Sequence, residues 1–196
     1  MKKMSLLVVL VALVSMGCAS SGPKVATAQA QGAPEWVMKG SGAFGGDKGK
    51  AFYGVASASN SSNMSLMRTA ADNRARNEVA KTIQLYTASL MKDYQATTSA
   101  GTAGGTAEEQ HIEQAVKTVT AMTLSGVEIV DHWQNAQSGE FFALARLDLN
   151  TVKDTFEKAK ELNTQVKDYV RKNADNLHDK LDAEIAKTAP KAEAAK

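Results

Sequence analysis

The spacing of apolar and polar residues along the chain predicts one mixed domain. Residues 51–59 are rich in aromatic and small side chains, which is typical of a β-strand, and Gly54 marks a close approach by another backbone. After capping residues at 60–63, apolar positions recur every three or four residues from Met64 to Leu90. This period predicts a helix of about 30 residues. The first half of that helix contains small residues that would let it lie close on a sheet: Ala70, Ala71, Ala75 and Ala80.

The second half of the chain predicts a further helix and a hairpin. A Gly-, Ala- and Thr-rich break spans 99–106, and the helical period resumes over 108–122, although its Thr-rich end at 118–123 equally suits the start of a strand. Strand-like runs at 127–133 and 141–147 flank a turn that contains glycine, which is a hairpin signal. The β-α-β-β order followed by a helix predicts an α+β fold, with a small antiparallel sheet and the long helix packed on one face.

The last helix is expected to be amphipathic and continuous over 151–187, with Asn150 as its cap. Its apolar positions from Val152 to Val170 are expected to pack on the sheet. At about 1.5 Å per residue, such a helix is longer than a compact domain of this size. Three later apolar residues should then project and form a short seam that joins two copies of the chain: Leu177, Leu181 and Ile185. The alternative is a frayed, solvated tail, and disorder is expected at 188–196.

The start of the chain has the pattern of a secreted, lipid-modified protein. Two lysines precede nine residues, Leu6 to Val14, without a charged or polar side chain. That length suits a signal-peptide core and is too short to span a bilayer of roughly 30 Å. Residues 15–18 (Ser-Met-Gly-Cys) resemble the lipobox of bacterial lipoproteins, in which the cysteine becomes the lipidated first residue. We expect a signal peptide at 1–17, diacylglycerol and an acyl chain on Cys18, and a flexible tether over 18–33.

Localisation and charge extend this interpretation. Ala19 follows the cysteine, where lipoproteins kept in the inner membrane commonly carry Asp, so the resemblance implies the outer membrane. Of the 23 Lys and Arg residues, two lie in the signal, and the remaining 21 balance the 21 Asp and Glu residues. This neutrality argues against a nucleic-acid partner. The single cysteine excludes an internal disulfide. An ordinary secretory signal with a stray cysteine, or an uncleaved anchor, is the alternative to lipidation.

Five segments of the mature chain follow one another in an order that matches a known family. They are Pro34-Glu35-Trp36-Val37, Phe52-Tyr53-Gly54-Val55-Ala56, residues 70–80, Leu124 to Trp133, and Phe141 to Asp148. Together they resemble the LPP-twenty-type lipoproteins, a family of small bacterial surface antigens. The resemblance covers roughly residues 34–156. It implies a helix-on-sheet domain, placed here at 34–150, and no catalytic residues.

Nucleotide binding has one weak motif in its favour. Gly40 to Gly45 match the letters G-x-G-x-x-G. A dinucleotide loop must follow a strand and open a helix, so that the phosphate meets the helix N-terminus. Here a polar stretch and then a strand follow the motif, so we expect a flexible loop without a cofactor.

The three histidines are the natural candidates for a catalytic or metal site. His111 and the acidic residue two positions later diverge on a helix. Asp131 and His132 are neighbours on a strand and point to opposite faces. His178 and Asp182, four apart, share a helix face, but their stretch is highly charged and we expect that face to be solvated. We therefore expect no metal site.

Basic residues on the long helix are a candidate surface for an anionic partner such as lipid headgroups: Arg68, Arg74, Arg76 and Lys81. Acidic residues interleave with them, and Asp72 lies four positions before Arg76, which favours a salt-bridged outer face. The two tryptophans, Trp36 and Trp133, are expected to pack on the sheet, with a ligand platform as the alternative. The expected core includes Tyr53, Phe142 and Leu144.

These observations favour a lipoprotein anchored in the outer membrane that acts as a non-enzymatic scaffold or assembly accessory of the envelope. Its expected contacts are the membrane, through the lipid on Cys18, an envelope protein, and a second copy of the chain through the C-terminal helix. A periplasmic ligand carrier, or a hydrolase whose site is not visible in the sequence, is the alternative. No serine stands in a nucleophile-elbow pattern.

Overall fold

Helices and strands form over most of the positions where the apolar period predicts them. The computed structural model describes residues 32–45, 50–98 and 107–188. Cys18, the expected signal peptide and most of the expected tether lie outside the described residues, as do the expected break at 99–106 and the end of the expected tail. The elements in chain order are α1 (Glu35–Lys39), η1 (Gly40–Phe44), β1 (Ala51–Ala58), α2 (Met64–Thr98), α3 (Ala107–Thr123), η2 (Leu124–Gly126), β2 (Glu128–Gln134), β3 (Phe141–Asp148), α4 (Leu149–Lys158) and α5 (Thr164–Thr188).

The three strands form one antiparallel sheet in the order β1-β3-β2, so the expected α+β class is confirmed. Strand β3 is central, and Leu147 pairs with Phe52 on one side while Ala145 pairs with Ile129 on the other side. The β2–β3 hairpin is the expected one. Gly139 in its turn has φ +73°, a conformation that favours glycine. The Thr-rich end of α3, which also suited a strand, is helical.

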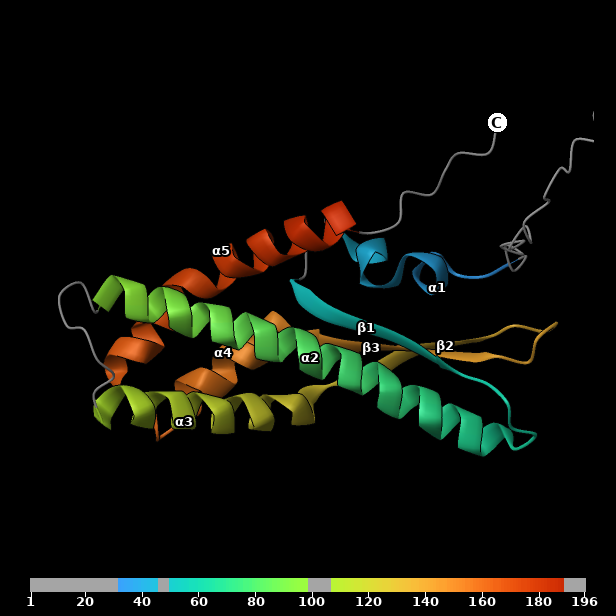
Figure 1. Ribbon diagram of the computed structural model, residues 1–196, viewed down its shortest axis with the longest axis horizontal. Coiled ribbons are helices and arrows are strands. Elements are labelled where there is room, and N and C mark those ends of the chain that lie inside the picture. The colour runs from blue at the N-terminus through green and yellow to red at the C-terminus, as the bar shows by residue number, and fades with distance from the viewer. Residues whose placement is uncertain (1–31, 46–49, 99–106, 189–196) are drawn as a thin grey trace, which may run out of the picture.

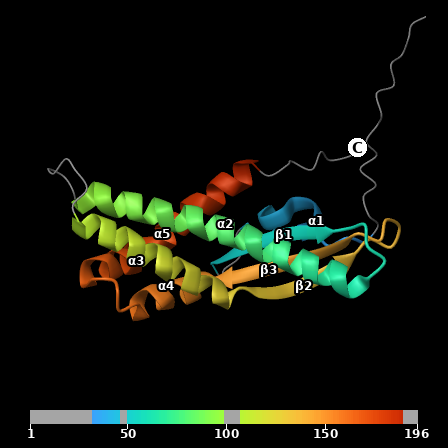
Figure 2. The same ribbon diagram turned by 60° about the horizontal axis from the view of Figure 1, so that its bottom comes forward.

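Helix α2 packs across one face of the sheet and continues past it, as Figures 1 and 2 show. Gly54 is the point of closest approach: a Cβ atom added there would lie 2.4 Å from the Ala75 carbonyl oxygen and 2.8 Å from the Val79 backbone nitrogen. Both Ala75 and Val79 are fully buried. The small residues of α2 and the glycine of β1 therefore let helix and strand backbones meet, as the sequence predicts.

Beyond the sheet, α3, α4 and α5 gather around the second half of α2 (Figure 1). One hydrophobic core runs through both parts of the molecule, and it includes side chains from the sheet and from α2 to α5. The largest fully buried apolar side chains of this core are Tyr86, Phe156, Ile83, Leu90, Leu147 and Leu149. The C-terminal helices thus share the core with the sheet.

The opposite face of the sheet is covered by α1 and η1, which lie on the other side of β1 from α2 (Figure 2). Trp36 of α1 is buried, and Phe44 of η1 stacks on Tyr53 with ring centroids 3.9 Å apart. Tyr53 and Phe142 point to this second face and are only half-buried, so their expected place in the core is wrong. Because neighbours alternate along a strand, Phe52 takes the core position. Leu144 is buried, as expected.

The segment expected to form one helix over 151–187 forms two. Helix α4 ends at Lys158, and the backbone N–H of Ala159 closes it on the Phe156 carbonyl. Asn163 then begins α5, because its side-chain oxygen accepts a hydrogen bond of 3.0 Å from the Val166 N–H. The turn between the helices lets α5 run back along α2 toward η1 (Figure 1), so most of α5 packs on helices and not on the sheet.

Because α5 runs back along α2, the three residues of the expected apolar seam are partly buried within the molecule. Leu177 and Leu181 are partly buried against the core, and Ile185 is half-buried. The expectation that these residues project beyond the sheet is therefore wrong. Self-association through this helix stays a prediction that would need a different surface of α5.

Candidate functional site

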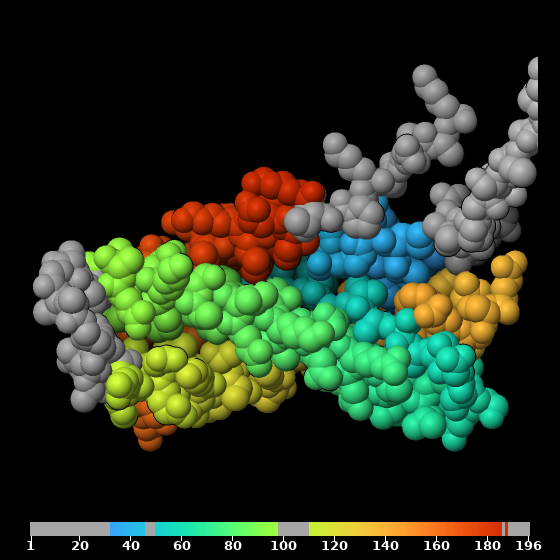
Figure 3. Space-filling model, viewed as in Figure 1, coloured from blue at the N-terminus to red at the C-terminus, as the bar shows by residue number. Residues whose placement is uncertain are grey.

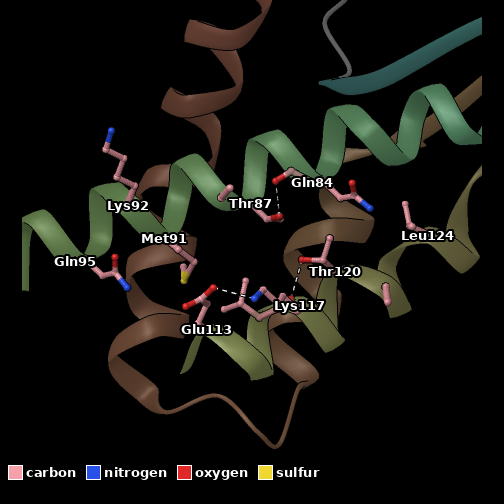
Figure 4. Close-up of a pocket in the computed structure, with 12 residues that line it drawn as sticks. Gln84, Thr87, Met91, Lys92, Gln95, Glu113, Lys117, Thr120 and Leu124 are labelled. Carbon is pink, nitrogen blue, oxygen red and sulfur yellow. Dashed lines mark hydrogen bonds and ion pairs between the residues drawn. The ribbon is translucent and has the colours of Figure 1, made fainter. Parts of the chain in front are cut away.

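A pocket of about 540 Å³ lies between α2 and α3. Figure 3 shows these two helices side by side on one face of the molecule, and Figure 4 shows the side chains that line the pocket. Ala88 on α2 and Ala121 on α3 line it and are exposed, so the pocket is an open groove. We call it the α2–α3 groove.

The floor of the α2–α3 groove is apolar although it contains two threonines. Met91 and Val116 are buried there. The Thr87 hydroxyl donates to the Ile83 carbonyl at 2.9 Å, and the Thr120 hydroxyl donates to the Val116 carbonyl at 2.7 Å. Since both hydroxyl protons bond to their own helix, the threonine methyl groups remain for contact with a ligand.

Charged side chains stand along the edges of the α2–α3 groove. Glu113 and Lys117 on α3 form an ion pair of 2.9 Å between two well-exposed side chains. Such an exposed pair contributes little to stability. Lys92 on α2 has no ion-pair partner in the described part of the chain. The groove therefore combines an apolar floor with an unpaired positive charge at its rim.

His132 and Asp131 diverge across β2, as the strand pattern predicts. The His132 Nε2 atom lies 2.6 Å from the Asp72 carboxylate on α2. Asp131 accepts a hydrogen bond of 3.0 Å from the Trp36 indole on α1. Each side chain thus ties β2 to a different helix. Asp72 pairs with His132, and no ion pair with Arg76 occurs among the described residues, so the expected i,i+4 pairing is wrong.

His178 is 1% exposed, so the expectation of a solvated face is wrong for this residue. Its Nε2 atom lies 3.1 Å from the Ala51 carbonyl, and its ring packs edge-on against Phe52. Its Nδ1 atom has no hydrogen bond and lies 3.3 Å from the Asp182 carboxylate. The signal for burial was present in the sequence, because Val170, Ala174 and His178 continue one stripe at a spacing of four residues.

A charged cluster surrounds His178 where α5 passes the start of β1. Lys50 pairs with Asp179 at 2.8 Å, and Lys153 of α4 pairs with Asp175 at 2.8 Å. The hydrogen bond from Lys153 holds the pKa of the Asp175 carboxyl below its usual value, against the opposing effect of burial. Burial raises the pKa of the Asp182 carboxyl, and the nearby His178 opposes that shift.

Burial also raises the pKa of the Tyr86 phenol well above its ordinary value, and its hydroxyl donates to the Ala174 carbonyl at 2.9 Å. Tyr86 therefore acts as a neutral donor that ties α2 to α5. No group of three or more His, Cys, Asp and Glu side chains is placed to hold a metal ion within 32–45, 50–98 and 107–188.

The remaining sequence candidates do not converge on one place. The Gly40 to Gly45 motif forms η1, a short 3-10 turn that opens no α-helix, so a phosphate would meet no helix N-terminus there. Arg74 of the basic set donates to the Ser57 carbonyl at 2.7 Å, and Lys81 pairs with Glu78. Trp133 packs against Phe142 on the sheet. His111 is exposed on α3.

A family model, described as LPP20 lipoprotein, matches residues 34–148. That range runs from the residue before α1 to the end of β3 and covers more than half of the chain. The chain belongs to the LPP20 lipoprotein family. Helices α4 and α5 follow the matched region, yet they complete its core. Among curated proteins, no sequence matches the chain.

Membership of the LPP20 family makes this chain a lipoprotein, in agreement with the resemblance of its sequence. In the part of the chain that the structure describes, none of the helices combines the length and the apolar character needed to cross a bilayer. The α2–α3 groove was not visible in the sequence of this LPP20 protein. A groove depends on how two helices pack, and its floor residues look like ordinary core positions in the sequence.

Proposed function

We propose that this LPP20 lipoprotein is anchored in the outer membrane by lipid on Cys18 and serves as a non-enzymatic scaffold of the envelope. The family membership supports lipid attachment, and Cys18 is the only thiol to which the lipid could be joined. Ala19 after it supports the outer membrane by analogy with lipoprotein sorting. A diacylglycerol plus an acyl chain provides the two or more chains that stable anchoring requires.

The observation that carries the scaffold role is the α2–α3 groove. The threonine hydroxyls of the groove donate hydrogen bonds to carbonyls of their own helices, and its one acidic side chain, Glu113, is paired with Lys117. The groove surface therefore suits contact with a partner more than catalysis. The two histidine contacts, the partly buried one of His132 with Asp72 and the buried one of His178 with the Ala51 carbonyl, lie outside the groove lining. This arrangement supports a protein that binds a partner.

The partner that fits the groove is an amphipathic helix. The groove-lining residues of α2 run from Gln84 to Gln95, which is about 16 Å, or three helical turns. A helix of that length lays apolar side chains at spacings of three and four onto the apolar floor. An acidic residue beside that stripe would pair with Lys92, the unpaired charge at the rim.

Photo-crosslinking in intact cells tests the groove. A photoreactive phenylalanine at Ala88 or Ala121, both exposed in the groove, should capture one envelope protein. The matched control is Ala136, which is exposed in the β2–β3 turn far along the sheet from the groove lining. Equal capture from Ala136 and Ala88 would contradict the groove as the docking site.

A groove volume of about 540 Å³ also suits a small apolar ligand. Recovery of a small molecule, without a protein crosslink, would replace the scaffold by the ligand carrier.

Anchoring is tested separately. Cys18→Ser should abolish acyl labelling and release the protein from outer-membrane fractions, because no other cysteine is present. A variant that keeps a labelled acyl chain and remains in those fractions would show that the lipid is not attached at Cys18.

A further inference from the structure

The environment of His178 leaves one ring nitrogen in need of a positive partner. A carbonyl oxygen only accepts hydrogen bonds, so the Nε2 atom, 3.1 Å from the Ala51 carbonyl, must carry a proton. In the neutral ring the lone pair then sits on Nδ1, which is buried and has no hydrogen bond. A buried acceptor without a partner is costly.

The nearest polar group cannot satisfy this lone pair by itself. The Asp182 carboxylate oxygen lies 3.3 Å from Nδ1, and an ionised carboxylate is also only an acceptor. A cation between the two atoms removes the conflict. Two metal–ligand bonds of about 2.0–2.1 Å at a tetrahedral angle place their donor atoms roughly 3.3–3.4 Å apart. The observed separation of Nδ1 and the carboxylate oxygen matches that span.

Space and charge around the pair also favour a cation. His178 and Asp182 both line a small cavity of about 30 Å³, which is large enough for one bound ion or water. The charged groups of the cluster come from α5, from α4 and from the residue before β1: Asp175, Asp179, Asp182, Lys153 and Lys50. Three aspartates against two lysines leave one negative charge when His178 is neutral.

We propose that His178 Nδ1 and Asp182 bind a divalent transition metal ion, such as Zn²⁺, with water completing the coordination. A His and a carboxylate four residues apart on a helix share the spacing that helical zinc motifs use. The Ala51 carbonyl orients the imidazole in the way that carbonyls do behind metal-bound histidines. An imidazole ligand selects a transition metal over Mg²⁺ or Ca²⁺. The ion would fix α5 to the edge of the sheet, and a proton on His178 is the competing occupant.

Metal titration of the untagged, lipid-anchored chain in detergent tests the proposal. After treatment with a chelator, added Zn²⁺ should raise the melting temperature in a concentration-dependent way, because an ion that binds only the folded state stabilises it. Mg²⁺ at the same concentrations should not. Cu²⁺ bound in the same position should show coupling to a single imidazole nitrogen in its electron paramagnetic resonance spectrum.

Two substitutions and one control locate the site. Asp182→Asn keeps the buried imidazole and removes one ligand, and it should weaken Zn²⁺ binding at least about tenfold, the loss typical of removing even an outer-shell partner. His178→Gln should do the same where it folds. His111→Gln changes an exposed histidine on α3 and should leave binding unchanged. The proposal is overturned by an unchanged wild-type melting temperature, by equal binding in Asp182→Asn, or by an imidazolium at His178 that Zn²⁺ does not displace.

Discussion

Gly54→Ala should destabilise the LPP20 domain, because it places a methyl group where two backbones meet. The new Cβ atom would lie 2.4 Å from the Ala75 carbonyl oxygen, 2.8 Å from the Val79 nitrogen and 2.9 Å from the Val79 side chain. Ordinary contact begins at about 3.4 Å, so α2 must move by roughly 1 Å. Backbone atoms of a 35-residue helix cannot turn aside as a flexible side chain can.

The expected cost follows from that movement. Overpacking of a tight core typically costs about 1–3 kcal/mol. Replacing glycine with alanine also lowers the conformational entropy of the unfolded chain, which by itself stabilises the folded state by about 0.4–1 kcal/mol. Since two of the three contacts are with backbone, we expect a cost at the upper end of that range and a net loss of about 2 kcal/mol, which lowers the melting temperature of a domain of this size by roughly 4–8 °C.

Thermal denaturation followed by far-ultraviolet circular dichroism measures this loss. Gly45→Ala is the matched control, because Gly45 has φ −57° and the added Cβ would meet only the Gly42 carbonyl oxygen at 3.9 Å. The control should melt at or slightly above the wild-type temperature. If Gly54→Ala melts within about 1 °C of Gly45→Ala, α2 does not contact β1 as described.

Three further predictions concern the sheet and the charged cluster. Phe52→Ala should cost about 3–5 kcal/mol of unfolding free energy in urea titrations, and Phe142→Ala should cost clearly less, because Phe52 is 3% exposed and Phe142 is half-buried; equal losses would contradict the assignment of the two faces. Trp36→Phe keeps an aromatic ring and removes the hydrogen bond to Asp131, so a loss of about 1 kcal/mol is expected, and Asp131→Asn combined with it should add little in a double-mutant cycle. The lowered pKa of Asp175, caused mainly by the Lys153 hydrogen bond, means that the folded state favours the ionised carboxyl. Its contribution is present above the unfolded pKa of about 3.9 and disappears as the pH falls through the folded pKa. The stability difference between wild type and Asp175→Asn should therefore shrink below about pH 4, and a constant difference down to pH 2 would refute the pairing.

Local order was largely available from the sequence. Helix α2, helix α3 and the β2–β3 hairpin follow from the spacing of apolar residues and from the residue types in the turns. Both signals involve residues close together in the sequence, so they can be recognised without the tertiary structure. The close approach at Gly54 was also predictable, since only a residue without a Cβ atom fits against small helix residues. The family signature lies in these same local segments.

Partnerships between distant residues were decided only by the tertiary structure. Strand alternation shows that Tyr53 and Phe52 point to opposite faces, but it does not show which face α2 covers. The turn at 159–163, after which Asn163 caps α5, lets Leu177 and Leu181 pack toward the core. His178 looked solvated because its neighbours are charged, yet it is buried, with its Nε2 atom 3.1 Å from the Ala51 carbonyl at the start of β1. Periodicity places a residue on a face, whereas burial depends on what packs against that face, and that partner comes from elsewhere in the chain.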